Sequence, residues 1–540
     1  MPHKIGPKED ALTLRFGGGL HTRATEADID ARECSDGENF DLDLQNDSFR
    51  PRRPFDLVGT VPNAGEIRGF ITLRESDGST SLLVQAEDKV YELTYPSNTP
   101  TFTEKATVAA TAQLRGTLQS QWQLDDEVLI TDLNLADVVM VWDGTTLSDV
   151  VFTDEDGGAF GTFKARYCLV RDERAIFANT EDGVSATPHL IVGTKRSDYT
   201  NITVTNRPSS AIAEDDPFFL IQPDLRYING LQPAFDVIAT SSRDGALFYL
   251  AGDSAQDFSF KPLYPFSGVT GNEAIMNIGN DVIYGRQGII ESLVSTDKFG
   301  DTETDDLSAD IKDQIDGYDD WTIAYNSRTQ RVYCYSDGSH EIWVFYKPLA
   351  GAIAGEDQRA LSPWIRYTTK HDMNMDPTCM MQVYDPLDGL EYIFFGDDSG
   401  NVYRMEGSTG DGDGGTEQVK ANRLSKLFIL PLDLEAYEFD CWISYRRREP
   451  ITVTIKFYYQ GYQIYREQVE IGLENVDAAY YGGAYYYGGP VYYSIPRFQY
   501  KREKFAVPGK SGTFQIEVET EDTADFEIQE IGIRFEATSS

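Results

Sequence analysis

A short phrase that recurs roughly every 40 to 50 residues constrains the fold of this chain most. Each copy has a run of β-branched and aromatic residues, a turn built from Asp, Gly or Asn, and a second such run. A period of this length built from hairpins is typical of a β-propeller, in which each repeat is one four-stranded blade packed against its neighbours. Copies occur at residues 82–93, 127–144, 246–253, 281–288, 331–338 and 392–403.

These phrases predict an all-β fold, with a β-propeller of six or seven degenerate blades over residues 61–407. With 540 residues the chain is too long for one ordinary core, so further domains are expected. Helical periodicity is scarce. Its best candidate is 305–315, where Leu307, Ile311 and Ile315 are spaced i, i+4, i+8, and it predicts one short inserted helix.

The regions on either side of the propeller differ from a blade. Residues 1–60 hold glycines and an Arg-Pro stretch that favour turns and extended backbone, so we expect an extended docking segment there. A Gly/Asp-rich linker is expected at 408–420. Residues 421–540 contain runs that alternate apolar and polar side chains with period two, which predicts a C-terminal antiparallel, sandwich-like β domain.

Charge is strongly acidic and unevenly distributed. The chain has 88 acidic and 47 basic residues, a formal net charge of −41, and the first 415 residues hold 69 of the acidic and 33 of the basic ones. A solvated acidic surface that keeps the protein soluble is one interpretation. The alternative is a surface that repels nucleic acid, because no Lys/Arg cluster with interleaved aromatics offers affinity for phosphates.

Motifs for catalysis or for cofactors are not found. The glycines of 17–19 lack phosphate-loop spacing, and no nucleophile elbow, zinc-protease helix or kinase motif occurs. The five cysteines are scattered and form no CxxC pair, so we expect reduced, structural thiols. Asp411 and Asp413 imitate the start of a calcium loop, but its twelfth position is Asn422. We therefore expect no enzyme activity, no catalytic residue, no cofactor, no metal site and no small-molecule substrate.

Two segments are candidate contact sites for other proteins. Residues 480–493 hold seven tyrosines among glycines, too many for every hydroxyl to find a partner in a core. We expect an exposed loop that contacts a partner, and the alternative is a locally packed loop with its hydroxyls in water. The candidate loop residues are Tyr480, Tyr481, Tyr485, Tyr486, Tyr487, Tyr492 and Tyr493. The candidate N-terminal docking segment is Phe49, Arg50, Pro51, Arg52, Arg53, Pro54 and Phe55.

The N-terminal phrases resemble a known pattern. The glycine-rich start at 16–20, the Glu-Asn-hydrophobic segment at 38–43 and the Arg-Pro element at 49–55 are similar to the start of many bacteriophage virion proteins. The stretch 125–144, which ends in Trp142-Asp143-Gly144, looks like a blade phrase common in those chains. With the propeller, the C-terminal β domain and the acidity, the chain resembles the tail nozzle and tail hub proteins of short-tailed phages.

This resemblance implies a structural role in the virion tail, with assembly in the host cytoplasm. Such proteins form rings, typically hexamers, below the portal and adaptor, and they dock tail fibres or other tail proteins. Genomic DNA would pass through an acidic lumen without tight binding. The alternative from the residues themselves is a propeller that binds or cleaves carbohydrate, with a receptor-binding or fibre-attachment role, since aromatic-rich blades offer stacking surfaces.

Overall fold

The structure is a computed structural model in which the chain forms two compact units. The propeller unit comprises residues 57–342 and 373–406, and the two-sheet unit comprises residues 1–56, 343–372 and 407–540. The structure describes residues 8–539 apart from 44–47, 98, 234–237, 242–244, 265–267, 280, 297–300, 349–352, 355–358, 369–376, 386–388, 407–418, 430–433, 448–450, 460–461, 472–498, 512 and 522–525.

The propeller unit is built from small antiparallel sheets that follow one another along the chain. The first is β6 (Ile67–Arg74), β7 (Thr80–Ala86), β8 (Lys89–Leu93) and β9 (Phe102–Thr107). The second is β10 (Leu114–Arg115), β11 (Gln121–Trp122), β12 (Glu127–Asp132), β13 (Met140–Trp142) and β14 (Leu147–Asp149). The third is β15 (Lys164–Arg171), β16 (Arg174–Glu181), β17 (Ala186–Gly193) and β18 (Phe218–Ile221).

The remaining sheets continue this pattern. The fourth is β19 (Ile228–Gln232), β20 (Ile238–Ser241), β21 (Leu247–Ala251) and β22 (Ser259–Tyr264). The fifth is β23 (Ile275–Asn277), β24 (Asp281–Arg286), β25 (Ile289–Thr296) and β26 (Asp301–Asp306). The sixth starts with β27 (Trp321–Asn326), β28 (Arg331–Ser336) and β29 (Glu341–Tyr346), and the unit boundary falls within β29. The seventh is β33 (Cys379–Asp385), β34 (Leu390–Gly396), β35 (Asn401–Arg404) and β5 (Asp56–Thr60).

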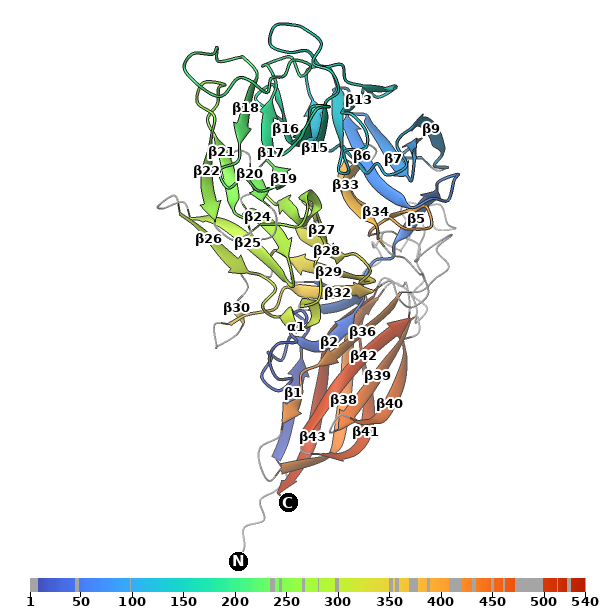
Figure 1. Cartoon of the computed structure of the whole chain (residues 1–540). Coiled ribbons are helices and arrows are strands. Elements are labelled where there is room, and N and C mark those ends of the chain that lie inside the picture. Colours follow the sequence, from blue (N-terminus) through green and yellow to red (C-terminus); the bar gives the residue numbers. More distant parts are fainter. Residues whose placement is uncertain are drawn as a thin grey trace, which may run out of the picture. The chain divides into compact units, whose positions relative to one another are not determined.

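These seven sheets close into a ring. Strands near the start of each sheet contact strands near the start of the next sheet, in the order β6, β10 and β12, β15, β19, β23, β27 and β33. Strand β33 of the last sheet contacts β6 of the first sheet, which closes the ring. Strand β5 precedes the first blade in the sequence yet forms the outer edge of the last sheet, so the two ends of the ring are joined by a strand. The unit is therefore a seven-bladed β-propeller, which confirms the predicted fold class (Figure 1).

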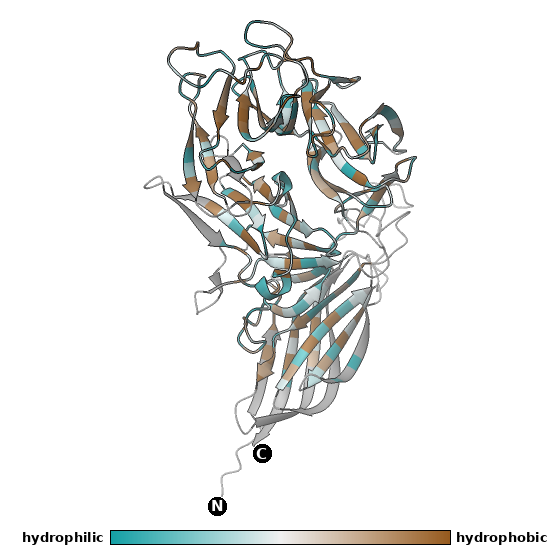
Figure 2. Cartoon of the chain, in the orientation of Figure 1, coloured by the Kyte–Doolittle hydropathy of each residue, from teal (hydrophilic) through white to brown (hydrophobic). Residues whose placement is uncertain are grey.

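The core of the ring lies between neighbouring blades. One cluster joins the third and fourth sheets, where Phe218 stacks on Phe258 with ring centroids 4.5 Å apart. Another joins the seventh and first sheets through Phe394, Val402 and Val84. In Figure 2 the blade strands are rich in apolar residues and the connections are mostly hydrophilic. Each blade thus buries its faces against its neighbours, as the sequence period predicts.

Part of the acidity of the blades has a local structural cause. The Asp132 carboxylate accepts hydrogen bonds from the backbone N–H groups of Asn134, Ala136 and Asp137, at 3.0, 2.7 and 2.9 Å. Asp397 accepts in the same way from Asn401, at 2.7 Å. Aspartate favours turns because its side chain satisfies the backbone donors of the next few residues. Turn chemistry therefore accounts for some of the excess of acid in the repeats.

The predicted helix over 305–315 is wrong in its extent. Only α1 (Lys312–Ile315) is α-helical, and β26 ends at Asp306. The Asp306 side chain accepts from the backbone N–H of Ser308 at 3.1 Å and from its hydroxyl at 2.8 Å, which favours a turn over a continuing helix. The apolar spacing instead serves the core, since Ile311 and Ile315 are fully buried. No described helix is both long and apolar enough to span a membrane.

The two-sheet unit consists mainly of two six-stranded sheets. One contains β1 (Lys8–Leu14), β3 (Phe40–Asp43), β4 (Ser48–Pro51), β38 (Leu434–Arg447), β41 (Gln499–Ser511) and β43 (Phe526–Ser539). The other contains β2 (Cys34–Glu38), β36 (Lys420–Ser425), β37 (Phe428–Ile429), β39 (Ile451–Tyr459), β40 (Tyr462–Ile471) and β42 (Thr513–Glu521). The hairpin of β30 (Ile353–Ala354) and β31 (Arg359–Ala360) and strand β32 (Trp364–Thr368) also belong to it.

The structure differs here from the division expected at residue 60. Strand β1 pairs antiparallel with β43, and β2 pairs antiparallel with β36, so the N-terminal residues complete the sheets of the C-terminal domain. The physical reason is that extended strands carry unpaired backbone donors and acceptors, which a neighbouring sheet edge satisfies. Sequence patterns within 60 residues hold no information about a partner hundreds of residues away.

Candidate functional site

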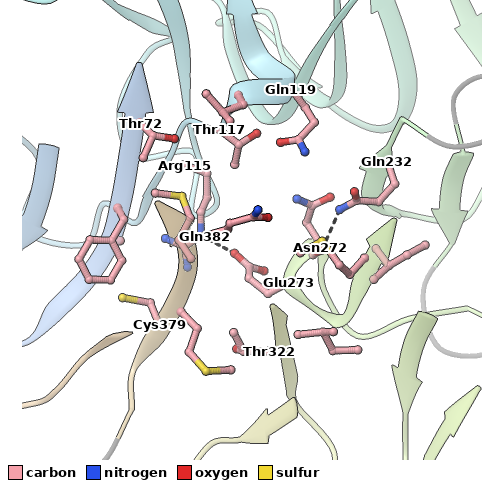
Figure 3. A pocket seen from close by; sticks show the side chains of 18 of the residues that line it. Thr72, Arg115, Thr117, Gln119, Gln232, Asn272, Glu273, Thr322, Cys379 and Gln382 are labelled. Atoms are coloured by element: carbon pink, nitrogen blue, oxygen red, sulfur yellow. Dashed lines mark hydrogen bonds and ion pairs between the residues drawn. The ribbon is translucent and has the colours of Figure 1, made fainter. Parts of the chain in front are cut away.

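A pocket lies at the centre of the propeller unit, where the inner strands of all seven blades meet. The volume that the centres of water molecules can reach in this pocket is about 140 Å³. This is enough for several water molecules or a small ligand. Figure 3 shows its polar side chains around one common space. They are Thr72, Arg115, Thr117, Gln119, Gln232, Asn272, Glu273, Thr322 and Gln382.

Two short 3-10 turns bring part of this polar set to the pocket. The turn η1 (Leu118–Ser120) interrupts the inner strand of the second blade, and η2 (Asn272–Ala274) precedes that of the fifth. The Ser120 hydroxyl holds η1, accepting from the Thr117 N–H and donating to the Thr117 carbonyl, both at 2.8 Å. The Asn272 side chain holds η2 by accepting from the Leu231 N–H at 2.9 Å. The turns therefore place Gln119 and Glu273 at the pocket (Figure 3).

An ion pair between Arg115 and Glu273 crosses the pocket. The Arg115 Nε donates to Glu273 Oε1, and Arg115 Nη1 donates to the carbonyls of Arg68 and Leu114 at 2.7 and 2.8 Å. The second and fifth blades lie on opposite sides of a seven-bladed ring. This ion pair therefore spans the central space enclosed by the inner strands of the blades, which we call the bore. The two side chains are 15% and 23% exposed, which leaves them in contact with solvent in the pocket.

Gly69 makes room for this arginine. A Cβ at residue 69 would lie 2.5 Å from the Leu114 carbonyl oxygen and 2.7 Å from Arg115 Nη1. We expect Gly69→Ala to lower the free energy of unfolding of the propeller unit by about 2 kcal/mol, since the backbone of the second blade must shift. Chemical denaturation, monitored by hydrogen exchange in the propeller unit, measures this change in the free energy of unfolding. In the control Gly317→Ala, where a Cβ meets nothing within 4 Å, stability should stay within about 1 kcal/mol; an equal loss in both variants would contradict the packing argument.

The sulfur groups at the pocket are poor nucleophiles. Burial raises the pKa of Cys379 to about 11, against an opposing effect from the Arg115 charge, and burial also raises the pKa of Cys168. Both thiols are therefore protonated near neutral pH, and the thiolate is the reactive form. All five cysteines are free in the structure. The pocket offers hydrogen-bond donors and acceptors, with Phe70, Met276 and Met380 as apolar wall.

The candidate N-terminal docking segment lies largely inside the two-sheet unit. Phe49 and Phe55 are buried, and Pro51, Arg52 and Pro54 are buried as well. The Arg52 guanidinium carbon lies 3.8 Å from the centroid of the Phe55 ring, and its Nε donates to Asn39 Oδ1 at 2.9 Å.

Of these seven residues Arg53 is exposed and Arg50 is half-buried, with Nη2 lying 3.7 Å from Asp41 Oδ2. This segment therefore presents little surface for docking, and its apolar residues serve the core. The tyrosine loop of residues 480–493, and Asp411 and Asp413, lie outside the described residues.

The residues of the bore were not identified from the sequence. Arg115 and Glu273 are 158 positions apart and belong to no motif, so only the closed ring brings them together. The one local signal was the break in the period-two pattern at Thr117 to Ser120, inside the inner strand of a blade.

Comparisons with known proteins find only distant likenesses. No family model and no curated protein matches the sequence. Similar solved structures include YCF48 from Cyanidioschyzon merolae, with 10% identity, a TM-score of 0.39 and coverage of 65% of this chain and 98% of that one. A catalytically inactive virginiamycin B lyase from Staphylococcus aureus with quinupristin has 10% identity, a TM-score of 0.37 and the same coverage.

The WD40 domain of Toxoplasma gondii coronin has 10% identity, a TM-score of 0.36 and coverage of 69% of this chain and 86% of that one. At these TM-scores the likenesses carry no argument about function. The assignment of the propeller rests on the strand pairing and ring closure described above.

Proposed function

We propose that this chain is a structural subunit of a bacteriophage tail, a ring-forming nozzle or hub protein that conducts the genome and docks other tail proteins. The observation that carries the proposal is the distribution of charge. The propeller unit has 52 acidic and 21 basic residues, so it holds −31 of the net −41. A ring of such units presents DNA with a surface that repels phosphates, which suits passage without tight binding.

The passage in this proposal lies between subunits and not within one propeller. The bore of the propeller unit is crossed by the Arg115–Glu273 pair and offers only about 140 Å³. That space is far too small for a double helix. Several copies around a common axis would therefore have to enclose the channel, and the N-terminal phrases that resemble phage virion proteins support this arrangement. The tyrosine loop of residues 480–493 stays a candidate for contacts between copies or with other tail proteins.

Mass measurement tests this proposal directly. The subunit has a mass of 60.5 kDa, so a hexamer would have a mass of roughly 360 kDa. We expect quantitative mass spectrometry of purified phage particles to find about six copies per particle. The isolated protein should show no binding to duplex DNA at 50 mM salt, a condition that favours contacts with phosphates. Absence of the chain from particles, or tight salt-sensitive binding to DNA, would reject the proposal.

A further inference from the structure

The pocket in the bore of the propeller holds hydrogen-bonding groups that the protein itself does not use. The amides of Gln119 and Gln382 and the hydroxyls of Thr72 and Thr322 make no side-chain hydrogen bond to any other described residue. They come from the sixth, seventh, first and second blades, which are consecutive in the ring, and they line the same pocket (Figure 3). Amides and hydroxyls offer both donors and acceptors, so together they can bind a ligand that has several polar groups of both kinds.

The ion pair adds a donor and an acceptor side by side. Arg115 uses Nε for Glu273 and Nη1 for two carbonyls. Among the described residues no partner hydrogen-bonds to Arg115 Nη2 or to Glu273 Oε2. A guanidinium N–H next to a carboxylate oxygen matches a hydroxyl group, which accepts from the first and donates to the second, and charge-assisted hydrogen bonds are the stronger kind.

The charge of the pocket selects against ions. Glu273 repels an anionic ligand that approaches Arg115, and the net −31 of the propeller unit acts in the same direction. Among the described residues that line the pocket, a cation finds one carboxylate, that of Glu273, which Arg115 already neutralises. Mixed donors and acceptors with balanced charge therefore favour a neutral ligand. The apolar wall of Phe70, Met276 and Met380 suits its C–H groups.

We propose that the bore of the propeller unit binds a neutral polyhydroxylated ligand, with a single neutral sugar unit as the best fit. Gln119 of the second blade and Gln382 of the seventh blade bind its hydroxyls, and the Arg115–Glu273 pair binds one hydroxyl as donor and acceptor. This site does not depend on the tail role proposed above. A subunit absent from phage particles could still bind sugar, and a tail subunit could fail to bind it.

Calorimetric titration of the full chain tests the site with named probes. The neutral probes are glucose, galactose, mannose and N-acetylglucosamine, and the anionic probe is glucuronate. We expect at least one neutral probe to bind and glucuronate not to bind. Gln119→Leu combined with Gln382→Leu should weaken binding about tenfold, because two hydrogen bonds are lost. The control Gln123→Leu, at an exposed turn residue outside the pocket, should bind as the wild type does.

A charge-neutralising variant tests the selectivity of the pocket for neutral ligands and the role of the ion pair. Glu273→Gln keeps the size of the side chain and removes its charge, so Arg115 becomes available to a carboxylate. We expect this variant to gain affinity for glucuronate. It also provides an independent test of the site if the double Gln variant does not fold. The proposal is overturned if none of the four neutral sugars binds, if the double variant binds as well as Gln123→Leu, or if wild-type protein prefers glucuronate.

Discussion

Replacing Gly19 with alanine is expected to destabilise the two-sheet unit by about 3 kcal/mol or more. A Cβ at this position would lie 2.2 Å from the Trp364 carbonyl oxygen and 2.8 Å from that of Ser362. Both obstacles are backbone atoms in a hydrogen-bonded arrangement, since the N–H groups of Gly19 and Leu20 donate to these same carbonyls at 2.8 and 2.7 Å. Overpacking against backbone is costly because no side chain can rotate away.

The loss of stability caused by Gly19→Ala should appear in the two-sheet unit before it appears in the propeller unit. Hydrogen exchange followed by mass spectrometry reports the two-sheet unit and the propeller unit separately, which a single melting curve does not. We expect faster exchange in β2 and β36 of Gly19→Ala, with little change in the blades. Gly317→Ala, which adds its methyl group in open space within the propeller unit, is the matched control. Unchanged exchange in β2 would contradict this prediction, because it would show that the backbone around residue 19 can shift at little cost in free energy.

Gly19 also shows what a sequence leaves open. In the sequence, the three glycines of 17–19 are compatible with a tight turn, and they lack the spacing of a phosphate loop. In the structure Gly19 is needed for close approach of extended backbone: its carbonyl accepts from the Cys34 N–H at 3.1 Å while its own N–H donates to Ser362. A glycine needed for a turn and one needed for packing look the same in a sequence.

Local patterns identified the blades well. The phrase at residues 82–93 predicts a hairpin, and the structure has β7 and β8 there, with Glu87 in the left-handed conformation that the tight turn requires. The partners of the first and last strands could not be predicted. Strand β5 closes the seventh blade, and β1 pairs with β43 more than 500 residues away. Such pairing depends on which sheet edge remains open after the rest has folded, and no short pattern records it.

In the candidate site, too, some features follow from local sequence patterns and others do not. The apolar core between blades arises from the repeat, so each copy contributes similar residues. The polar groups of the bore do not repeat: Gln119 comes from a 3-10 turn, Gln382 from a regular strand and Glu273 from a turn before a strand. Each stands out only once the ring has closed. For this reason the sequence predicted no small-molecule substrate and no site residue in the bore, whereas the structure carries a proposal for a ligand there.

Replacing Arg174 with methionine is expected to have the second large effect, a loss of about 3 to 5 kcal/mol in the propeller unit. This side chain is only 1% exposed, and its guanidinium binds the long connection between β17 and β18. Nη1 donates to the carbonyls of Thr194 and Asp216 at 2.5 and 2.9 Å, and Nη2 donates to that of Glu214 at 2.5 Å. Methionine fills a similar volume but leaves three acceptors without a donor.

The matched control for this prediction is Arg196→Met, in the same connection. Arg196 is 48% exposed and pairs with Glu173 and Asp215 at 3.5 and 3.8 Å, so its loss should cost at most about 1 kcal/mol. Urea denaturation with hydrogen exchange over residues 194–216 compares the two variants. Arg174→Lys should be destabilised nearly as much as Arg174→Met, because one ammonium group cannot replace the planar guanidinium that reaches three carbonyls. If Arg174→Lys keeps wild-type stability, the charge and not the shape of the guanidinium holds this connection.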